Sequence, residues 1–257
     1  DKSFFPTQTI VPSTEIVQDR VMLELFRGCI RGCRFCQAGY VYRPVRNRSR
    51  ELCARYGVEA CNDSGYQEVT LSSLSTSDYP QLTELCDDLE GFCQERHVNL
   101  SLPSLRADNF SMSLMQRLAK GRKSGLTFAP EAGTQRLRDV INKNVTQEEL
   151  LASCRTAFAG GYSAVKLYFM LGLPTETDED VLGIADLAAR VMHAWRESAS
   201  NKQRGVRITV STSWFVPKPH TAFQWEPQIS KEEYQRRVKL LREAITTKTV
   251  TYNWHAP

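Results

Sequence analysis

The chain alternates short apolar runs with longer amphipathic stretches, and this order limits the folds available to it. Strands that alternate with helices form a parallel sheet with helical crossovers. Six such units predict an α/β fold, either an open partial barrel or a doubly wound sheet. Expected strands are 21–25, 68–71, 98–102, 126–128, 164–170 and 207–215, and expected helices are 48–56, 81–96, 111–120, 146–158, 181–195 and 230–246.

Composition agrees with one globular domain. The chain has 257 residues, of which 41% are hydrophobic and 24% are charged, with both signs interspersed. No apolar run approaches the roughly 20 residues that cross a bilayer. Eight cysteines in a chain of this length indicate free thiols of a cytoplasmic protein better than a secreted disulfide framework.

Three cysteines with the spacing Cx3Cx2C lie in a loop directly after the first expected strand. Cys29, Cys33 and Cys36 are interleaved with glycines, which let a backbone wrap closely around a bulky ligand. Thiolates select zinc or iron–sulfur clusters. A four-iron cluster held by three thiolates keeps one iron free for another ligand, whereas a structural zinc site needs a fourth side chain such as Cys53 or Cys61.

The same segment is rich in arginine. Seven arginines lie between positions 27 and 50. One interpretation is that they compensate the negative charge of a thiolate-bound cluster. The more specific alternative is that they attract an anionic substrate such as RNA.

This loop resembles the signature of the radical S-adenosylmethionine (SAM) superfamily, in which an aromatic residue, here Phe35, precedes the last cysteine. The surrounding blocks 27–49, 72–79, 101–106, 127–143, 166–180 and 215–225 resemble radical SAM proteins of the B12-binding type. The resemblance implies a partial (β/α)6 TIM-like barrel with a [4Fe–4S] cluster on Cys29, Cys33 and Cys36. It also implies reductive cleavage of SAM to a 5′-deoxyadenosyl radical.

Further residues follow from the resemblance, because superfamily members contact SAM at the ends of their strands. Ser75 and Asp78 are expected to accept hydrogen bonds from the SAM ammonium, although Ser77 or Asp78 would also suit a helix N-cap. Arg106 is a candidate partner of the SAM carboxylate, or else of Asp108.

The later strands supply the remaining candidates. Glu131 is expected at the ribose hydroxyls and Lys143 at the methionine carboxylate, unless Lys143 is a solvated cation at a helix end. Leu171 and Gly172 are expected beside adenine, although Gly172 would also end a strand. Phe215 and Pro217 are expected on the adenine or substrate side of the site.

The resemblance implies that residues 1–257 form one catalytic core, with 1–20 leading in from an upstream domain and 247–257 beginning a downstream segment. The expected partners are an unidentified substrate and an electron donor such as flavodoxin or ferredoxin, with cobalamin a further cofactor if the full-length protein binds it. RNA or ribosomal-protein modification, as by a methylthiotransferase, and a non-catalytic, zinc-stabilised RNA-binding domain are the alternatives.

Overall fold

The computed structural model describes residues 4–102, 126–203 and 205–256. Its first sheet is parallel, in the order β1-β4-β5, and consists of β1 (Val21–Glu24), β4 (Glu68–Ser72) and β5 (Asn99–Ser101). Helices α2 (Arg50–Ser64) and α3 (Leu82–Glu95) are the crossovers between these strands. Their apolar faces enclose one core with Leu23, Leu71 and Leu85, all of which are fully buried.

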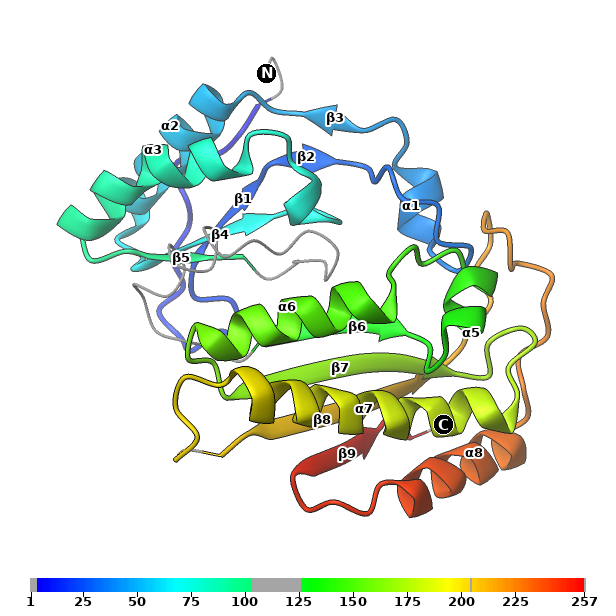
Figure 1. Cartoon of the computed structure of the whole chain (residues 1–257). Coiled ribbons are helices and arrows are strands. Elements are labelled where there is room, and N and C mark those ends of the chain that lie inside the picture. Colours follow the sequence, from blue (N-terminus) through cyan, green and yellow to red (C-terminus); the bar gives the residue numbers. More distant parts are fainter. Residues whose placement is uncertain (1–3, 103–125, 204, 257) are drawn as a thin grey trace.

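The second sheet is also parallel, in the order β6-β7-β8-β9. Its strands are β6 (Leu126–Glu131), β7 (Ala164–Leu171), β8 (Arg207–Trp214) and β9 (Val250–Trp254). Helices α6 (Gln147–Ala159), α7 (Asp178–Ser198) and α8 (Lys231–Ala244) cover its outer face, as Figure 1 shows. Between them lies the largest hydrophobic core of the described residues.

Alternation along β7 separates the two faces of this sheet. Val165, Leu167, Phe169 and Leu171 are buried in the core under the helices, while the residues between them are half-buried on the opposite face. This period of two is the strand pattern that points successive side chains to opposite faces. The inner face therefore carries Met170 rather than Leu171.

Four short elements complete the end of the barrel where the strands terminate. Strands β2 (Phe26–Arg27) and β3 (Arg46–Asn47) form an antiparallel ribbon, and helix α1 (Gln37–Val41) lies in the chain between them. Helix α5 (Gln135–Val140) follows β6. In Figure 1, α1, α5 and the segment after β8 lie together at the end toward which the strand arrows point.

The partial barrel expected from the sequence is confirmed, with differences at particular elements. Helix α2 continues to Ser64 rather than 56, and it ends at Gly65, whose φ of 73° suits a glycine C-cap. Strand β9 was not predicted and extends the second sheet. The helix expected at 111–120 lies outside the described residues. None of the described helices is both long enough and apolar enough to cross a membrane.

Candidate functional site

The cysteine loop begins and ends in the β2–β3 ribbon. Phe26 is paired with Asn47, and Arg27 with Arg46, so the chain returns beside its starting point after the three cysteines. Gly28 turns the chain into the loop with a φ of 94°, and a Cβ on it would lie 2.7 Å from the carbonyl oxygen of Tyr42. Only glycine fits this turn without strain.

The loop is bound to segments that follow three different strands. After β6, the Arg34 N–H donates to the Ile141 carbonyl (3.0 Å), and the Asn142 side chain donates to the Gly32 carbonyl (2.8 Å). After β8, the Phe223 N–H donates to the Arg34 carbonyl (3.2 Å). After β4, Asp78 forms an ion pair with Arg31.

A small hydrophobic cluster packs against the cysteine loop. It combines Ala132, Leu137, Ile141, Leu173, Phe215 and Phe223 with the half-buried side chains of Phe35, Val140 and Met170. The rings of Phe215 and Phe223 meet edge to face at 6.1 Å, an arrangement that aromatic pairs prefer. The cluster therefore fixes the loop to the carboxyl ends of β6, β7 and β8.

The thiols of the chain fall into two groups. Cys29, Cys33 and Cys36 lie in the loop, where the Arg31 N–H donates to the Cys29 Sγ (3.4 Å) and the Cys36 N–H to the Cys33 carbonyl (3.1 Å). Cys53 and Cys61 lie in the core beneath α2, and burial raises the pKa of each to about 11. A thiol with such a pKa is protonated at neutral pH and is a poor metal ligand.

Cys53 and Cys61 belong to the hydrophobic core formed with α2 and α3, whereas Phe35 of the cysteine loop packs on a different cluster. Among the described residues, no three Cys, His, Asp or Glu side chains are arranged to hold one metal ion. The three loop thiols nevertheless fit a cubane by donor chemistry, since each would bind a different iron and none needs to approach a common ion. Their assignment as ligands stays a prediction.

Glu131 and Lys143 are brought together beside the loop. The Lys143 Nζ lies 3.1 Å from the Glu131 Oε1, and it also lies 5.9 Å from the centre of the Phe35 ring. The Lys143 side chain is only 13% exposed, so the alternative of a solvated cation at a helix end is wrong. Glu131 has a φ of 69°, a left-handed conformation that a non-glycine residue adopts rarely and often at functional sites.

Ser75 and Asp78 also meet at this end of the barrel. The Ser75 hydroxyl donates to the Asp78 Oδ2 (2.7 Å), and the Arg31 Nε donates to the same oxygen (2.9 Å). The helix N-cap alternative is wrong, because α3 begins at Leu82 after Gln81, whose side chain makes no capping bond. No sequence pattern predicted the pairing of Arg31 with Asp78, which lie 47 positions apart.

The candidates after β7 and β8 occupy different surroundings. Leu171 is buried in the core under the helices, and only its backbone faces the end of the sheet. Gly172 has a φ of 87° and a Cβ there would lie 2.7 Å from the Ile229 side chain.

Phe215 belongs to the hydrophobic cluster that packs against the cysteine loop, and Pro217 is half-buried. Met170, the first residue of the apolar stretch 170–174 that the resemblance places beside adenine, lies on the inner face. Arg106 and its alternative partner Asp108 lie outside the described residues.

The three-thiol loop is bound across the carboxyl ends of the strands, which is the end of a barrel where enzymes have their active sites. The chain belongs to the radical SAM superfamily, since the model of that superfamily matches residues 23–188. Enzymes of this class use a [4Fe–4S] cluster and SAM.

Individual relatives show the same family. An uncharacterized protein of Methanocaldococcus jannaschii is 36% identical over 225 residues, which are 87% of this chain and 46% of that protein. The ribosomal protein uS12 methylthiotransferase RimO of Pelotomaculum thermopropionicum is 27% identical over 181 residues, which are 65% of this chain and 39% of RimO. The chain thus spans less than half the length of these relatives.

A solved structure shares the fold. The radical SAM methyltransferase TsrM from Kitasatospora setae, with cobalamin and a [4Fe–4S] cluster bound, matches with a TM-score of 0.60 and 13% identity. The match covers 79% of this chain and 38% of TsrM. At this identity the likeness concerns the fold alone.

Proposed function

We propose that Cys29, Cys33 and Cys36 hold a [4Fe–4S] cluster whose fourth iron binds SAM, and that the chain catalyses reductive cleavage of SAM to act on a substrate still to be identified. When bound and reduced, the cluster supplies one electron to the SAM sulfonium, which breaks a C–S bond to give methionine and a 5′-deoxyadenosyl radical. The observation that carries this proposal is the binding of the cysteine loop to the segments after β4, β6 and β8.

The surrounding side chains would hold the two ends of SAM. Lys143 matches the methionine carboxylate, and Glu131, its partner at 3.1 Å, would turn an oxygen to the ribose hydroxyls. Asp78 and Ser75 would accept from the ammonium. Phe35 and Met170 extend the apolar cluster under the loop, which would exclude water from the reacting atoms.

Iron content and SAM cleavage test this proposal together. Protein reconstituted without oxygen is expected to be brown, to contain about four irons per chain, and to release 5′-deoxyadenosine with dithionite and SAM. Cys33→Ala should lose the colour and the cleavage, whereas Cys93→Ala, which changes a half-buried core thiol, should keep both. Colourless protein with one zinc, or cleavage by Cys33→Ala, would overturn the assignment.

Group transfer is the outcome that the relatives favour. RimO is named a methylthiotransferase and TsrM a methyltransferase solved with cobalamin, so we propose that a methyl or methylthio group is transferred and that the full-length protein binds cobalamin. A reductant such as flavodoxin or ferredoxin, and a cytoplasmic location, complete the proposal. With methyl-labelled SAM and cell extract, label should enter RNA or protein digests; label in neither would contradict group transfer.

A further inference from the structure

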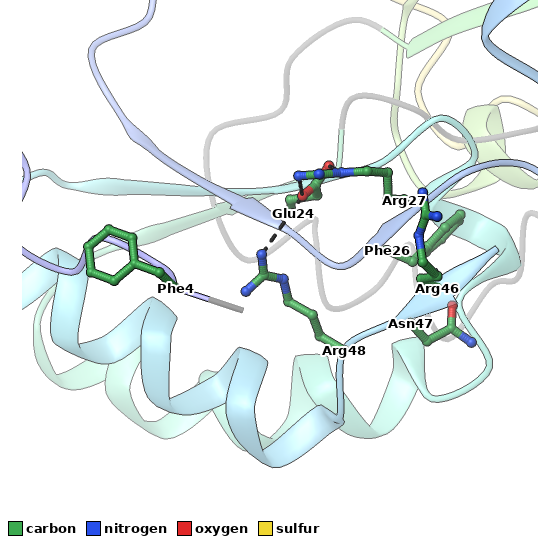
Figure 2. Close-up of a pocket in the computed structure, with 7 residues that line it drawn as sticks. All are labelled: Phe4, Glu24, Phe26, Arg27, Arg46, Asn47 and Arg48. Carbon is green, nitrogen blue, oxygen red and sulfur yellow. Dashed lines mark hydrogen bonds and ion pairs between the residues drawn. The ribbon is translucent and has the colours of Figure 1, made fainter. Parts of the chain in front are cut away.

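A pocket of about 370 Å³ lies beside the β2–β3 ribbon, where the cysteine loop begins and ends. Three guanidinium groups line it, those of Arg27, Arg46 and Arg48 (Figure 2). Its volume is at the lower end of the range of about 300–1,000 Å³ typical of ligand sites. None of its residues belongs to the predicted SAM contacts, so the pocket is a separate feature.

The charges in the pocket do not balance. Among the described residues that line it, Glu24 is the only carboxylate and three are arginines, which leaves two positive charges. Arg27 donates two hydrogen bonds to the Glu24 carboxylate, of 2.7 and 3.1 Å. The Arg48 Nη2 lies 3.8 Å from the Glu24 Oε2. Figure 2 shows Arg27 and Arg48 approaching Glu24 from different segments, with Arg46 beside Phe26.

Two of the arginines keep unused donors. The Arg48 side chain is only 12% exposed and is held by the rings of Phe5 (5.1 Å) and Tyr56 (6.0 Å), yet its buried Nη1 has no hydrogen-bond partner in the described part of the chain. A buried donor without a partner destabilises the folded protein. Arg46 makes one weak contact, from Nη2 to the Tyr42 carbonyl at 3.4 Å.

We infer that this pocket binds a phosphate monoester. Such a group carries a charge of about −1.5 to −2 at pH 7 and has three acceptor oxygens. It would neutralise the excess of two positive charges and accept from the free donors of Arg46, with the Arg48 Nη2, which lies 3.8 Å from Glu24, and the Asn47 amide as further donors. The phosphate comes either from a free metabolite or from the 5′ end of a nucleic acid strand.

The position of the pocket connects such a ligand to the cysteine loop. Arg27 and Arg46 are register partners in the ribbon from which the loop leaves and to which it returns. A phosphate bridging Arg46 and Arg48 would therefore brace the base of the loop. This role goes beyond SAM cleavage, and its test does not depend on cleavage.

Direct binding to the reconstituted full chain tests the inference. The probes are glycerol 3-phosphate, a small phosphate monoester, and an oligouridylate with a 5′ phosphate, both of which lack the adenine that a SAM site would recognise. Calorimetry at constant salt concentration should detect saturable binding of at least one probe. Arg46→Gln and Arg48→Gln should each weaken it by about tenfold or more.

Two further variants make the result specific. Glu24→Gln should strengthen binding several-fold, because it removes the competing carboxylate, and a general loss of structure would not do this. Arg190→Gln, which changes an exposed arginine paired with Asp186 on α7, should leave binding unchanged. Binding of only one probe would identify the source of the phosphate. The inference is overturned if neither probe binds, or if Arg46→Gln behaves like Arg190→Gln.

Discussion

Lys143 is positioned both by its burial and by its ion pair with Glu131. Its ammonium is held between the Glu131 carboxylate and the Phe35 ring, so it carries its charge into a mostly buried position beside the cysteine loop. A charge in such surroundings interacts more strongly with a ligand than an exposed one does. The carboxylate of SAM is the group that we propose for it.

Removal of this ammonium should weaken SAM binding. A hydrogen bond to a charged group contributes about 1.5–3 kcal/mol, so Lys143→Ala is expected to raise the dissociation constant of SAM by about ten- to a hundredfold. Equilibrium dialysis of reconstituted protein measures the constant. Lys239→Ala, which changes an exposed lysine of α8, is the control. Equal constants for the two variants would show that Lys143 does not contact SAM.

Among the elements, the turn from β7 to α7 is built around one buried carboxylate. Glu176 accepts a hydrogen bond from the Gly172 N–H (2.6 Å) and forms an ion pair with Arg237 of α8. Burial raises the pKa of Glu176 to about 7, although the Gly172 N–H and Arg237 act in the opposite direction. Glu176 holds the turn that carries Gly172, so protonation of this carboxylate changes a contact of the turn.

The stability of the protein should reflect this pKa. Between about pH 4.5 and 7 the folded chain binds a proton at Glu176 that the unfolded chain has released, so stability falls as pH rises through this window. At about 1.4 kcal/mol per pH unit, the full effect is about 3 kcal/mol. Urea unfolding at pH 5 and pH 8 should show a smaller difference in Glu176→Gln than in the natural protein.

Glu233 provides the comparison for Glu176, since it also contacts Arg237. Hydrogen bonds from Arg236 and Arg237 lower the pKa of Glu233 to about 2, so this carboxylate stays ionised in both states from pH 5 to 8. Glu233→Gln should therefore keep the natural dependence on pH. The assignment to Glu176 fails if Glu176→Gln retains that dependence as well.

The sequence predicted long elements better than short ones. The Thr146 capping box starts α6 as expected, since its pattern depends only on residues three positions apart. The two-residue strands β2 and β3 escaped prediction because no period can be read from two residues. Strand β9 was missed although Val250, Tyr252 and Trp254 alternate with polar residues, because an alternation over five residues is a weak signal.

The site was predictable in its parts but not in its contacts. Cysteine spacing identified the loop, and the resemblance indicated that Glu131 and Lys143 would be near it. The pairs Arg31–Asp78 and Asn142–Gly32 join residues 47 and 110 positions apart, and no local pattern encodes such contacts. Met170, and not Leu171, lies on the inner face, and this could be known only from the register of β7.

Across the entire chain, the hydrophobic cores are built without the three loop cysteines. None of Cys29, Cys33 and Cys36 belongs to a hydrophobic cluster of the described residues. The cores under α2–α3 and under α6–α8 are formed by apolar and aromatic side chains together with thiols that lie outside the loop. The barrel should therefore be stable before a cluster is inserted, unlike a small domain that folds only around its metal.

Iron removal tests this independence. Chelation of reconstituted protein should leave the far-ultraviolet circular dichroism nearly unchanged, because the helices depend on apolar burial. Limited proteolysis should then cut within residues 28–45 faster than before, since the loop has lost its ligand. Cys93→Ala, treated in the same way, should behave like the natural protein. Unfolding of the helices on chelation would instead support the zinc-stabilised domain.

The two ends of the cysteine loop pair in the β2–β3 ribbon, and this has a consequence for variation among relatives. The chain departs at Arg27 and returns at Arg46 as neighbours in one ribbon, so the separation of these two points does not depend on how many residues lie between them. Insertions or deletions near α1 could change the span of the loop while the barrel strands keep their register. New substrate contacts could arise there without any repacking of the cores.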